Sequence, residues 1–195
     1  LLEFIKEMHD TVSISLGHSE AGYEIADAAY KAGANHATHL FNAMPPLHHR
    51  DPGIIGAAAD NPDVMVEVIC DGIHINPAVI RIIFKIFGDN RVILISDAMR
   101  AMGMEDGTYE LGGQDVFKHG HRATLADGTL AGSATHLFDC VRNAVSFGIP
   151  LESAIKAATR NPAKSIGADH IGGFSVGKEA DILLVDKDLN LIRVL

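Results

Sequence analysis

Short apolar segments alternate with helical segments along the first hundred residues, and this alternation restricts the chain to few architectures. The apolar segments have the length of strands, and each ends beside a polar residue; they cover residues 11–16, 35–38, 64–70 and 91–95. Helical patterns occur between them at 19–32, with Ser19 as the expected N-cap, and from Pro77 to about Phe87. Strands and helices alternating at this spacing predict a parallel sheet. Right-handed crossovers then place the carboxyl ends of all its strands on one side.

Polar side chains follow the predicted strands where each strand ends. In strand order they are His18, His39, His74 and Asp97. Because the carboxyl ends of parallel strands share one edge, we expect these side chains to converge on one face. That face is where barrel enzymes hold their catalytic groups.

Two interpretations are open for each of these residues. Taken singly, His18 and His39 are more often packed or capping histidines, but their place after consecutive strands favours a metal site, since neutral imidazole is a common zinc ligand. Two histidines do not complete a catalytic zinc site, which usually takes three protein ligands. Asp97 is either a turn cap or the general base for a metal-activated water. His74 either makes a structural hydrogen bond or contacts substrate.

Two loops offer further candidates. Arg50 follows His48 and His49 in a long predicted loop. It is either simply solvated or binds phosphate, because a guanidinium makes bidentate bonds to phosphate oxygens. The small-residue stretch 129–133 is either a tight connection or a place where substrate approaches the backbone closely.

The composition excludes several classes of partner. The net charge is -9, so we do not expect the basic surface that nucleic-acid binding requires. No apolar run approaches the roughly 20 residues of a membrane span. The two cysteines, Cys70 and Cys140, are expected to be buried thiols rather than a disulfide. The chain opens in mid-pattern at Leu1 without a signal-peptide pattern, so we expect the C-terminal piece of a longer cytoplasmic protein.

The pattern changes beyond residue 104. Glycines and alternating residues at 107–130 predict hairpins, and helical patterns follow at 135–147 and 151–159. Pro162 is expected to end the second of these helices, because proline disfavours helical conformation in the residue before it. Strands are predicted at 182–185 and 189–195.

Five stretches, taken in order, resemble one known family. They are 39–45, 50–53, 71–74, 96–99 and 130–133, which read His-Leu-Phe-Asn-Ala-Met-Pro, Arg-Asp-Pro-Gly, Asp-Gly-Ile-His, Ser-Asp-Ala-Met and Leu-Ala-Gly-Ser. They are similar to the N-acetylglucosamine-6-phosphate deacetylases, which belong to the amidohydrolase superfamily. The later Gly-Lys-Glu-Ala-Asp at 177–181 is shared with many amidohydrolases and indicates the superfamily only.

The resemblance implies an α/β fold, the C-terminal part of a metal-dependent (β/α)8 TIM barrel plus a strand portion of a small β-sandwich domain. Residues 1–170 would form the partial barrel, with a hairpin insertion near 107–130, and residues 171–195 would supply strands of the small domain. A partial barrel has two open strand edges. We therefore expect the isolated fragment to be poorly folded or oligomeric, with little activity.

The same resemblance implies roles for individual residues. His18 and His39 are metal ligands, Asp97 is the catalytic acid/base, and His74 contacts the sugar. The other implied substrate-binding residues are Asn42, Ala43, Arg50, Leu130, Ala131, Gly132 and Ser133. In the family that arginine serves the neighbouring subunit's site, so a homodimer is implied.

Some family features have no counterpart here. The family's glutamate metal ligand, and a histidine that polarises the carbonyl, come from strands that precede Leu1. His136 has no role that the resemblance assigns. The metal is expected to be zinc, with iron, manganese or cobalt as alternatives, and the choice between one ion and two is open.

The implied activity is hydrolysis of the acetamide of N-acetylglucosamine 6-phosphate to glucosamine 6-phosphate and acetate, with Asp97 as acid/base. Two other interpretations stay open. One is a different amidohydrolase, such as a cyclic amidase or a deaminase, which would not need the phosphate contact of Arg50. The other is a non-catalytic binding fragment that keeps only the shape of the fold.

Overall fold

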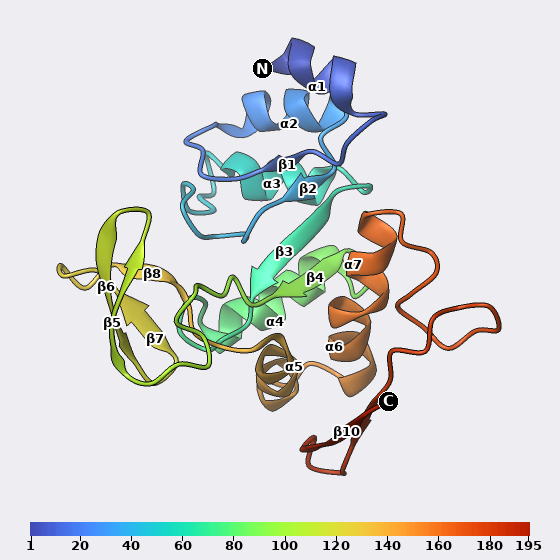
Figure 1. Cartoon of the computed structure of the whole chain (residues 1–195). Helices are drawn as coiled ribbons and strands as arrows, with labels where there is room; N and C mark the ends of the chain where they lie inside the picture. Colours follow the sequence, from blue (N-terminus) through green and yellow to red (C-terminus); the bar gives the residue numbers. More distant parts are fainter.

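The computed structural model describes all 195 residues, and a four-stranded parallel sheet lies at its centre (Figure 1). The strands, in their spatial order, are β1 (Ser15–Leu16), β2 (His36–Ala37), β3 (Met65–Ile69) and β4 (Val92–Ile95). Ser15 lies opposite His36, and Val66 lies opposite Val92. The predicted parallel sheet is confirmed, although β1 and β2 are shorter than expected.

Helices cover this sheet and form most of the core with it. They are α1 (Leu2–Met8), α2 (Tyr23–Lys31), α3 (Gly53–Asp60), α4 (Pro77–Phe87), α5 (Leu137–Ser146), α6 (Leu151–Ala158) and α7 (Arg160–Ser165). Val66 and Val68 of β3 pack with Ile80 and Ile83 of α4 in a cluster of 27 buried residues. Since side chains alternate along a strand, Glu67 lies on the opposite face of β3, away from α4.

Helix α4 shows how local sequence sets the limits of an element. The Asn76 side chain accepts a hydrogen bond from the Ala78 N–H at 2.9 Å, and Pro77 occupies the first helical position, where no N–H is needed. Gly88 ends the helix with a φ of 67°, which glycine adopts without strain. The predicted helix from Pro77 to Phe87 is confirmed.

Three predicted details of the helices are wrong. Ser19 does not cap α2, which begins at Tyr23 after Gly22; the Ser19 hydroxyl instead accepts a hydrogen bond from the Ala21 N–H. Helix α3 lies in the predicted long loop, because its sequence is apolar on nearly all sides and has no amphipathic period. Pro162 does not end helical structure but lies in the first turn of α7, where a missing N–H costs little.

The predicted hairpin region forms a separate antiparallel sheet, the left-hand lobe in Figure 1. Its strands are β5 (Gly107–Leu111), β6 (Gln114–His119), β7 (Arg122–Thr124) and β8 (Leu130–Ser133). Strand β8 also meets the end of β4, since the Ser133 N–H donates to the Asp97 carbonyl at 2.9 Å and the Met99 N–H donates to the Ser133 carbonyl at 2.8 Å. The hairpins are thereby attached directly to the polar end of the parallel sheet.

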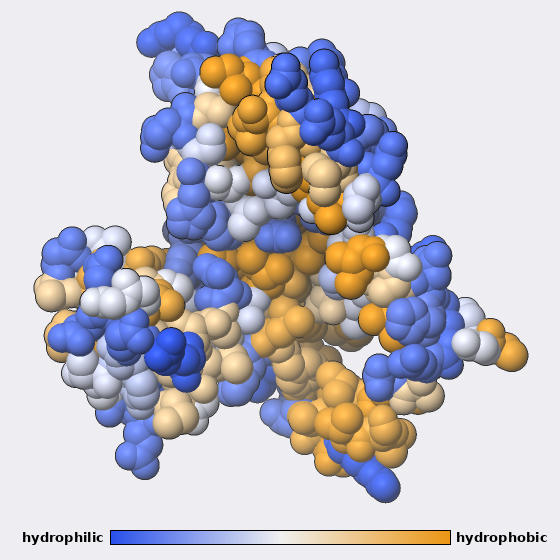
Figure 2. Space-filling view, turned by 45° about the horizontal axis from the view of Figure 1, so that its top comes forward, coloured by the Kyte–Doolittle hydropathy of each residue, from blue (hydrophilic) through white to orange (hydrophobic).

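The chain ends in a hairpin of β9 (Leu183–Val185) and β10 (Leu191–Val194). Its apolar side chains are exposed and form the orange lobe at the lower edge of Figure 2. Leu184 is 48% exposed and Ile192 is 61% exposed. Both predicted strands are therefore present, and they leave an apolar surface uncovered. None of the helices combines the length and apolar character that crossing a bilayer would need.

Candidate functional site

The candidate residues lie where strands end in unusual backbone conformations. His18, His39 and Asp97, at the ends of β1, β2 and β4, have φ values of 46°, 32° and 48°. Phe41 and Ala43 are also in this left-handed region, so five of the six non-glycine residues with positive φ belong to the predicted site segments. Each such conformation costs on the order of 1–3 kcal/mol, and such strain tends to cluster at functional sites.

His18 and His39 are brought together as predicted. Their ring centroids are 4.7 Å apart and the rings meet edge to face. The close approach depends on Gly17, because a Cβ at that position would lie 2.7 Å from the Cβ of Thr38. The absence of a side chain at Gly17 thus allows the end of β1 to lie directly against the end of β2.

The environment of His39 fits a metal ligand. The residue is 5% exposed, and its Nδ1 is buried without a hydrogen-bond partner. An unsatisfied buried nitrogen costs about 1–3 kcal/mol, which binding a cation would offset. No third histidine, cysteine or acid joins the pair in a cluster that could hold a metal ion. The two imidazoles therefore suit a metal but supply only part of a donor set.

Asp97 is exposed at the end of β4, and its carboxylate makes no hydrogen bond within the chain, so it is available to a reactant. Glu67 of β3 lies near it and near His39. Burial raises the pKa of Glu67, and the charge of Asp97 raises it further, while the backbone N–H and ring of His39 oppose the change. Glu67 is not among the residues predicted from the sequence. Its signal is a single acid within the otherwise apolar strand Met-Val-Glu-Val-Ile.

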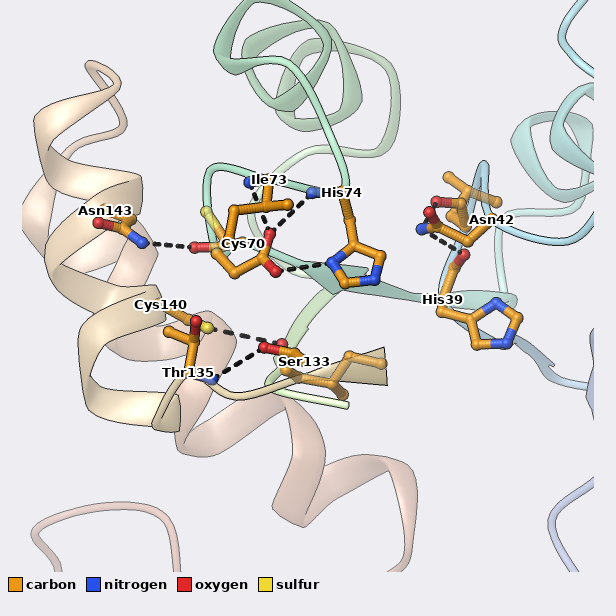
Figure 3. Close-up of polar contacts among 12 residues, drawn as sticks. His39, Asn42, Cys70, Ile73, His74, Ser133, Thr135, Cys140 and Asn143 are labelled. Carbon is orange, nitrogen blue, oxygen red and sulfur yellow. Dashed lines mark hydrogen bonds and ion pairs between the residues drawn. The ribbon is translucent and has the colours of Figure 1, made fainter. Parts of the chain in front are cut away.

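His74 is held by a buried carboxylate (Figure 3). The Asp71 side chain is fully buried, and its Oδ2 lies 2.6 Å from Nδ1 of His74. Its Oδ1 accepts the backbone N–H groups of Ile73 and His74 at 2.8 and 2.9 Å. Burial by itself raises the pKa of Asp71, but these three hydrogen bonds outweigh burial, and the pKa is lowered overall.

The loop after β2 is braced by the amide of Asn42. Its Nδ2 donates to the carbonyls of His39 and Leu40, at 3.1 and 3.3 Å (Figure 3). The amide nitrogen is therefore occupied within the loop, while Oδ1 has no partner there. Ala43 follows with a φ of 48° and is exposed.

Arg50 lies in an exposed cluster with its two preceding histidines. Its Nη1 lies 2.7 Å from Nε2 of His49, and the rings of His48 and His49 are 4.2 Å apart. It makes no hydrogen bond to His18, His39, His74 or Asp97. The structure thus places Arg50 on the surface, separate from the bonds that organise the other candidates.

The 130–133 stretch forms β8 and lies beside Asp97, to whose carbonyl the Ser133 N–H donates. Ser133 is buried, and its hydroxyl accepts a hydrogen bond from the Thr135 N–H at 3.0 Å. Gly132 has a φ of 76°, and a Cβ there would lie 3.4 Å from the Asp97 carbonyl. Ala131 is 8% exposed, and Leu130 is half-buried. The backbone of Gly132 and Ser133 therefore lies against the end of β4.

Comparison with known proteins relates the whole chain to one group of enzymes. The Amidohydrolase family matches residues 1–194. A curated N-acetylglucosamine-6-phosphate deacetylase of Bacillus subtilis (strain 168) is 41% identical over 193 residues, which is 97% of this chain and 49% of that protein. A curated N-acetylgalactosamine-6-phosphate deacetylase of Escherichia coli O157:H7 is 38% identical over 185 residues, which is 94% of this chain and 49% of that protein.

A solved structure gives the same result at the level of fold. An N-acetyl-D-glucosamine-6-phosphate deacetylase mutant from Mycobacterium smegmatis, in complex with N-acetyl-D-glucosamine-6-phosphate, matches with a TM-score of 0.95 and 38% identity. The match covers 100% of this chain and 52% of that one. This chain spans about half the length of the curated relatives it matches.

Proposed function

Because the chain belongs to the amidohydrolase family, we propose that the protein containing it is a metal-dependent hydrolase that removes the acetyl group from N-acetylglucosamine 6-phosphate. The products are glucosamine 6-phosphate and acetate. The observation that carries the proposal is the 41% identity to the Bacillus subtilis deacetylase across 97% of this chain. The relatives described above are all named as sugar-phosphate deacetylases, which favours this activity over that of a cyclic amidase or a deaminase.

A second candidate substrate is the C4 epimer, N-acetylgalactosamine 6-phosphate. The Escherichia coli enzyme that carries this sugar in its name is 38% identical to the chain, close to the value for the glucosamine enzyme. Overall identity therefore favours the glucosamine substrate only slightly. The two sugars must be compared directly.

The proposed metal ligands are His18 and His39, with further ligands supplied by the half of the protein outside this chain. A divalent cation held by these residues would polarise the acetamide carbonyl and lower the pKa of a water molecule. Zinc is our first choice, because imidazole suits zinc well. The unpartnered Nδ1 of His39 supports this assignment.

Asp97 is the proposed acid/base. Its carboxylate accepts a proton from the attacking water and then donates that proton to the departing amine. We expect Asp97→Asn to reduce kcat by roughly 10²- to 10⁴-fold while metal content is unchanged, as measured by acetate release and elemental analysis. Unaltered turnover in this variant would remove Asp97 from the mechanism.

The remaining proposed contacts position the sugar phosphate. The proposed sugar and pocket contacts are His74, Asn42, Ala43 and residues 130–133, and Arg50 is proposed to bind the phosphate. The exposure of Arg50 supports its service to the site of a second subunit in a homodimer, since it makes no bond to the candidate residues of its own chain. We further propose a cytoplasmic enzyme whose barrel is completed by the preceding half, with 1–170 as its second part and 171–195 in a small β-domain.

The test is acetate release by this chain and by an N-terminally extended protein of the relatives' length, both supplied with zinc. The substrates are the two epimeric N-acetylated sugar phosphates and unphosphorylated N-acetylglucosamine. We expect activity in the extended protein and preference for phosphorylated N-acetylglucosamine. Equal turnover of the phosphorylated and unphosphorylated sugar would contradict the substrate assignment, and preference for the galacto epimer would select the second candidate.

A further inference from the structure

Asp71 is buried beside the proposed sugar contact, and neither the metal ligands nor the acid/base step uses it. We propose that Asp71 is a positioning residue that fixes His74 in the tautomer with hydrogen on Nδ1, so that Nε2 of His74 accepts a hydrogen bond from a hydroxyl group of the sugar. This inference rests on the proposed function only for the identity of the ligand.

The hydrogen bonds of Asp71 determine which ring nitrogen bears the hydrogen. An ionised carboxylate only accepts hydrogen bonds, so the 2.6 Å contact requires Nδ1 of His74 to be the donor. In the neutral ring the other nitrogen, Nε2, is then an acceptor. The geometry also holds the ring in place, because the same carboxylate binds the backbone N–H of His74.

The second ring nitrogen is free for a ligand. Nε2 of His74 makes no hydrogen bond in the chain, and it is not among the buried polar atoms that lack a partner. It is therefore open to the surroundings although the side chain as a whole is only 7% exposed. A largely buried ring that presents one open acceptor suits a hydroxyl donor of a sugar and does not suit a phosphate, which has no hydrogen to donate when fully ionised.

The two carboxylate oxygens separate this role from a purely structural one. Oδ1 caps the turn by accepting the N–H groups of Ile73 and His74, whereas Oδ2 serves the imidazole (Figure 3). In Asp71→Asn the amide oxygen can keep the two backbone bonds. The amide NH₂ then faces Nδ1 as a donor, which selects the opposite tautomer and turns Nε2 into a donor.

The experiment uses the N-terminally extended, metal-loaded protein and compares Asp71→Asn, Asp71→Ala, His74→Ala and the Asp71→Asn/His74→Ala double variant. We expect Asp71→Asn to lower kcat/KM by roughly 10- to 100-fold, the effect of one lost hydrogen bond in a desolvated site. The loss falls mainly on KM, because the contact is to a non-reacting hydroxyl. In the His74→Ala background the same substitution has no further effect. Asp71→Ala also loses the cap and has the lowest melting temperature.

The nitrogen-15 chemical shifts of the His74 ring report directly which nitrogen bears the hydrogen. They would stay unchanged in Asp71→Asn if Asp71 had only a structural role. We expect a protonated Nδ1 and a bare Nε2 in the unmodified protein, and the reverse in Asp71→Asn. A bare Nδ1 in the unmodified protein, or an equal loss of kcat/KM in the presence and absence of His74, would overturn the inference. If the unmodified protein hydrolyses neither sugar phosphate, the proposed function and the sugar ligand are overturned, whereas the shifts still decide whether Asp71 sets the tautomer.

Discussion

His39 is the candidate residue whose surroundings most clearly call for a ligand. Its ring is nearly buried beside His18, and its Nδ1 has no partner. A protein interior seldom leaves such a nitrogen unsatisfied. The unpaired atom therefore supports the proposal that His39 binds a cation.

We expect His39→Ala in the extended protein to lose bound metal and to reduce acetate release by more than about 100-fold, since loss of a residue that merely supports a ligand already costs about 10- to 100-fold. Metal content and turnover are measured on the same sample. His119→Ala is the matched control, because that side chain is 96% exposed on the antiparallel sheet. Normal metal content in His39→Ala would refute the ligand assignment.

Asp71 determines in which direction the free energy of unfolding changes as the solution becomes acidic. Its pKa is lowered in the folded protein, so the folded state binds fewer protons than the unfolded state in the acid range. The stabilisation is present above the ordinary value of 3.8 and is lost as pH falls through the folded pKa. Below pH 3.8 the free energy of unfolding should fall more steeply in the unmodified extended protein than in Asp71→Asn. Urea titrations at several pH values check this, and parallel pH profiles would contradict it.

At the residue scale the sequence identifies polar groups that follow strands, but not how their backbones are held. The placement of His18 beside His39 follows from strand order alone. The left-handed conformations cannot be predicted in the same way, because positive φ is uncommon in non-glycine residues even though histidine and aspartate adopt it more often than most. Glu67 lies within β3 and not at its end, so a search for polar groups that follow strands does not select it, and only the fold shows which face it occupies.

At the scale of elements, the contact between β1 and β2 determines the spacing of the two histidines. Gly17 faces Thr38 where these strands end, and even a methyl group there would overlap the threonine. The strands would have to separate at the point where His18 approaches His39. Position 17 is therefore constrained by packing, although its residue makes no contact with a ligand.

We expect Gly17→Ala to lower the stability of the extended protein by about 1–3 kcal/mol, the usual cost of overpacking, and to weaken metal binding. Thermal unfolding and competition with a chelator measure the two effects. Gly173→Ala is the control, because a Cβ there meets nothing within 4 Å and its φ is not positive. If the two variants behave alike, the close contact does not constrain the site.

The elements differ in how far sequence determines them. Helix α4 is predicted from Pro77 at its first position, and the structure adds Asn76 as the N-cap and Gly88 as the C-cap. Helix α3 is not predicted, because burial on almost every side removes the periodicity by which a helix is recognised in sequence. Helix α7 forms because proline is tolerated in the first turn of a helix, where Pro162 lies. The prediction relied instead on the rule that proline disfavours helix in the residue before it, and that rule suggests a helix end.

At the scale of the whole molecule, this chain leaves apolar surface and strand edges without partners. Strand β1 is an edge of the parallel sheet, and the terminal hairpin of β9 and β10 is largely exposed. Exposed edges and apolar patches favour association. We expect the isolated chain to be poorly folded or to associate, and light scattering after gel filtration measures this directly.

The two buried thiols, Cys70 and Cys140, provide a second measurement of folding. Burial raises the pKa of both Cys70 and Cys140 to about 12. Because the thiolate is the reactive form, both should resist alkylation at pH 8 in a folded protein and react fast in an unfolded one. We expect slow alkylation in the extended protein and faster alkylation in the isolated chain. Equal protection in both would show that this half folds by itself.

The junction of β8 with the end of β4 joins the antiparallel sheet of hairpins to the parallel sheet. Two backbone hydrogen bonds make this junction: the Met99 N–H donates to the Ser133 carbonyl, and the Ser133 N–H donates to the carbonyl of Asp97, the proposed acid. An opening of this junction releases both amides at once and frees the backbone of Asp97 from the antiparallel sheet. Hydrogen exchange at the amides of Met99 and Ser133 would therefore report how often the backbone of the proposed acid separates from the antiparallel sheet.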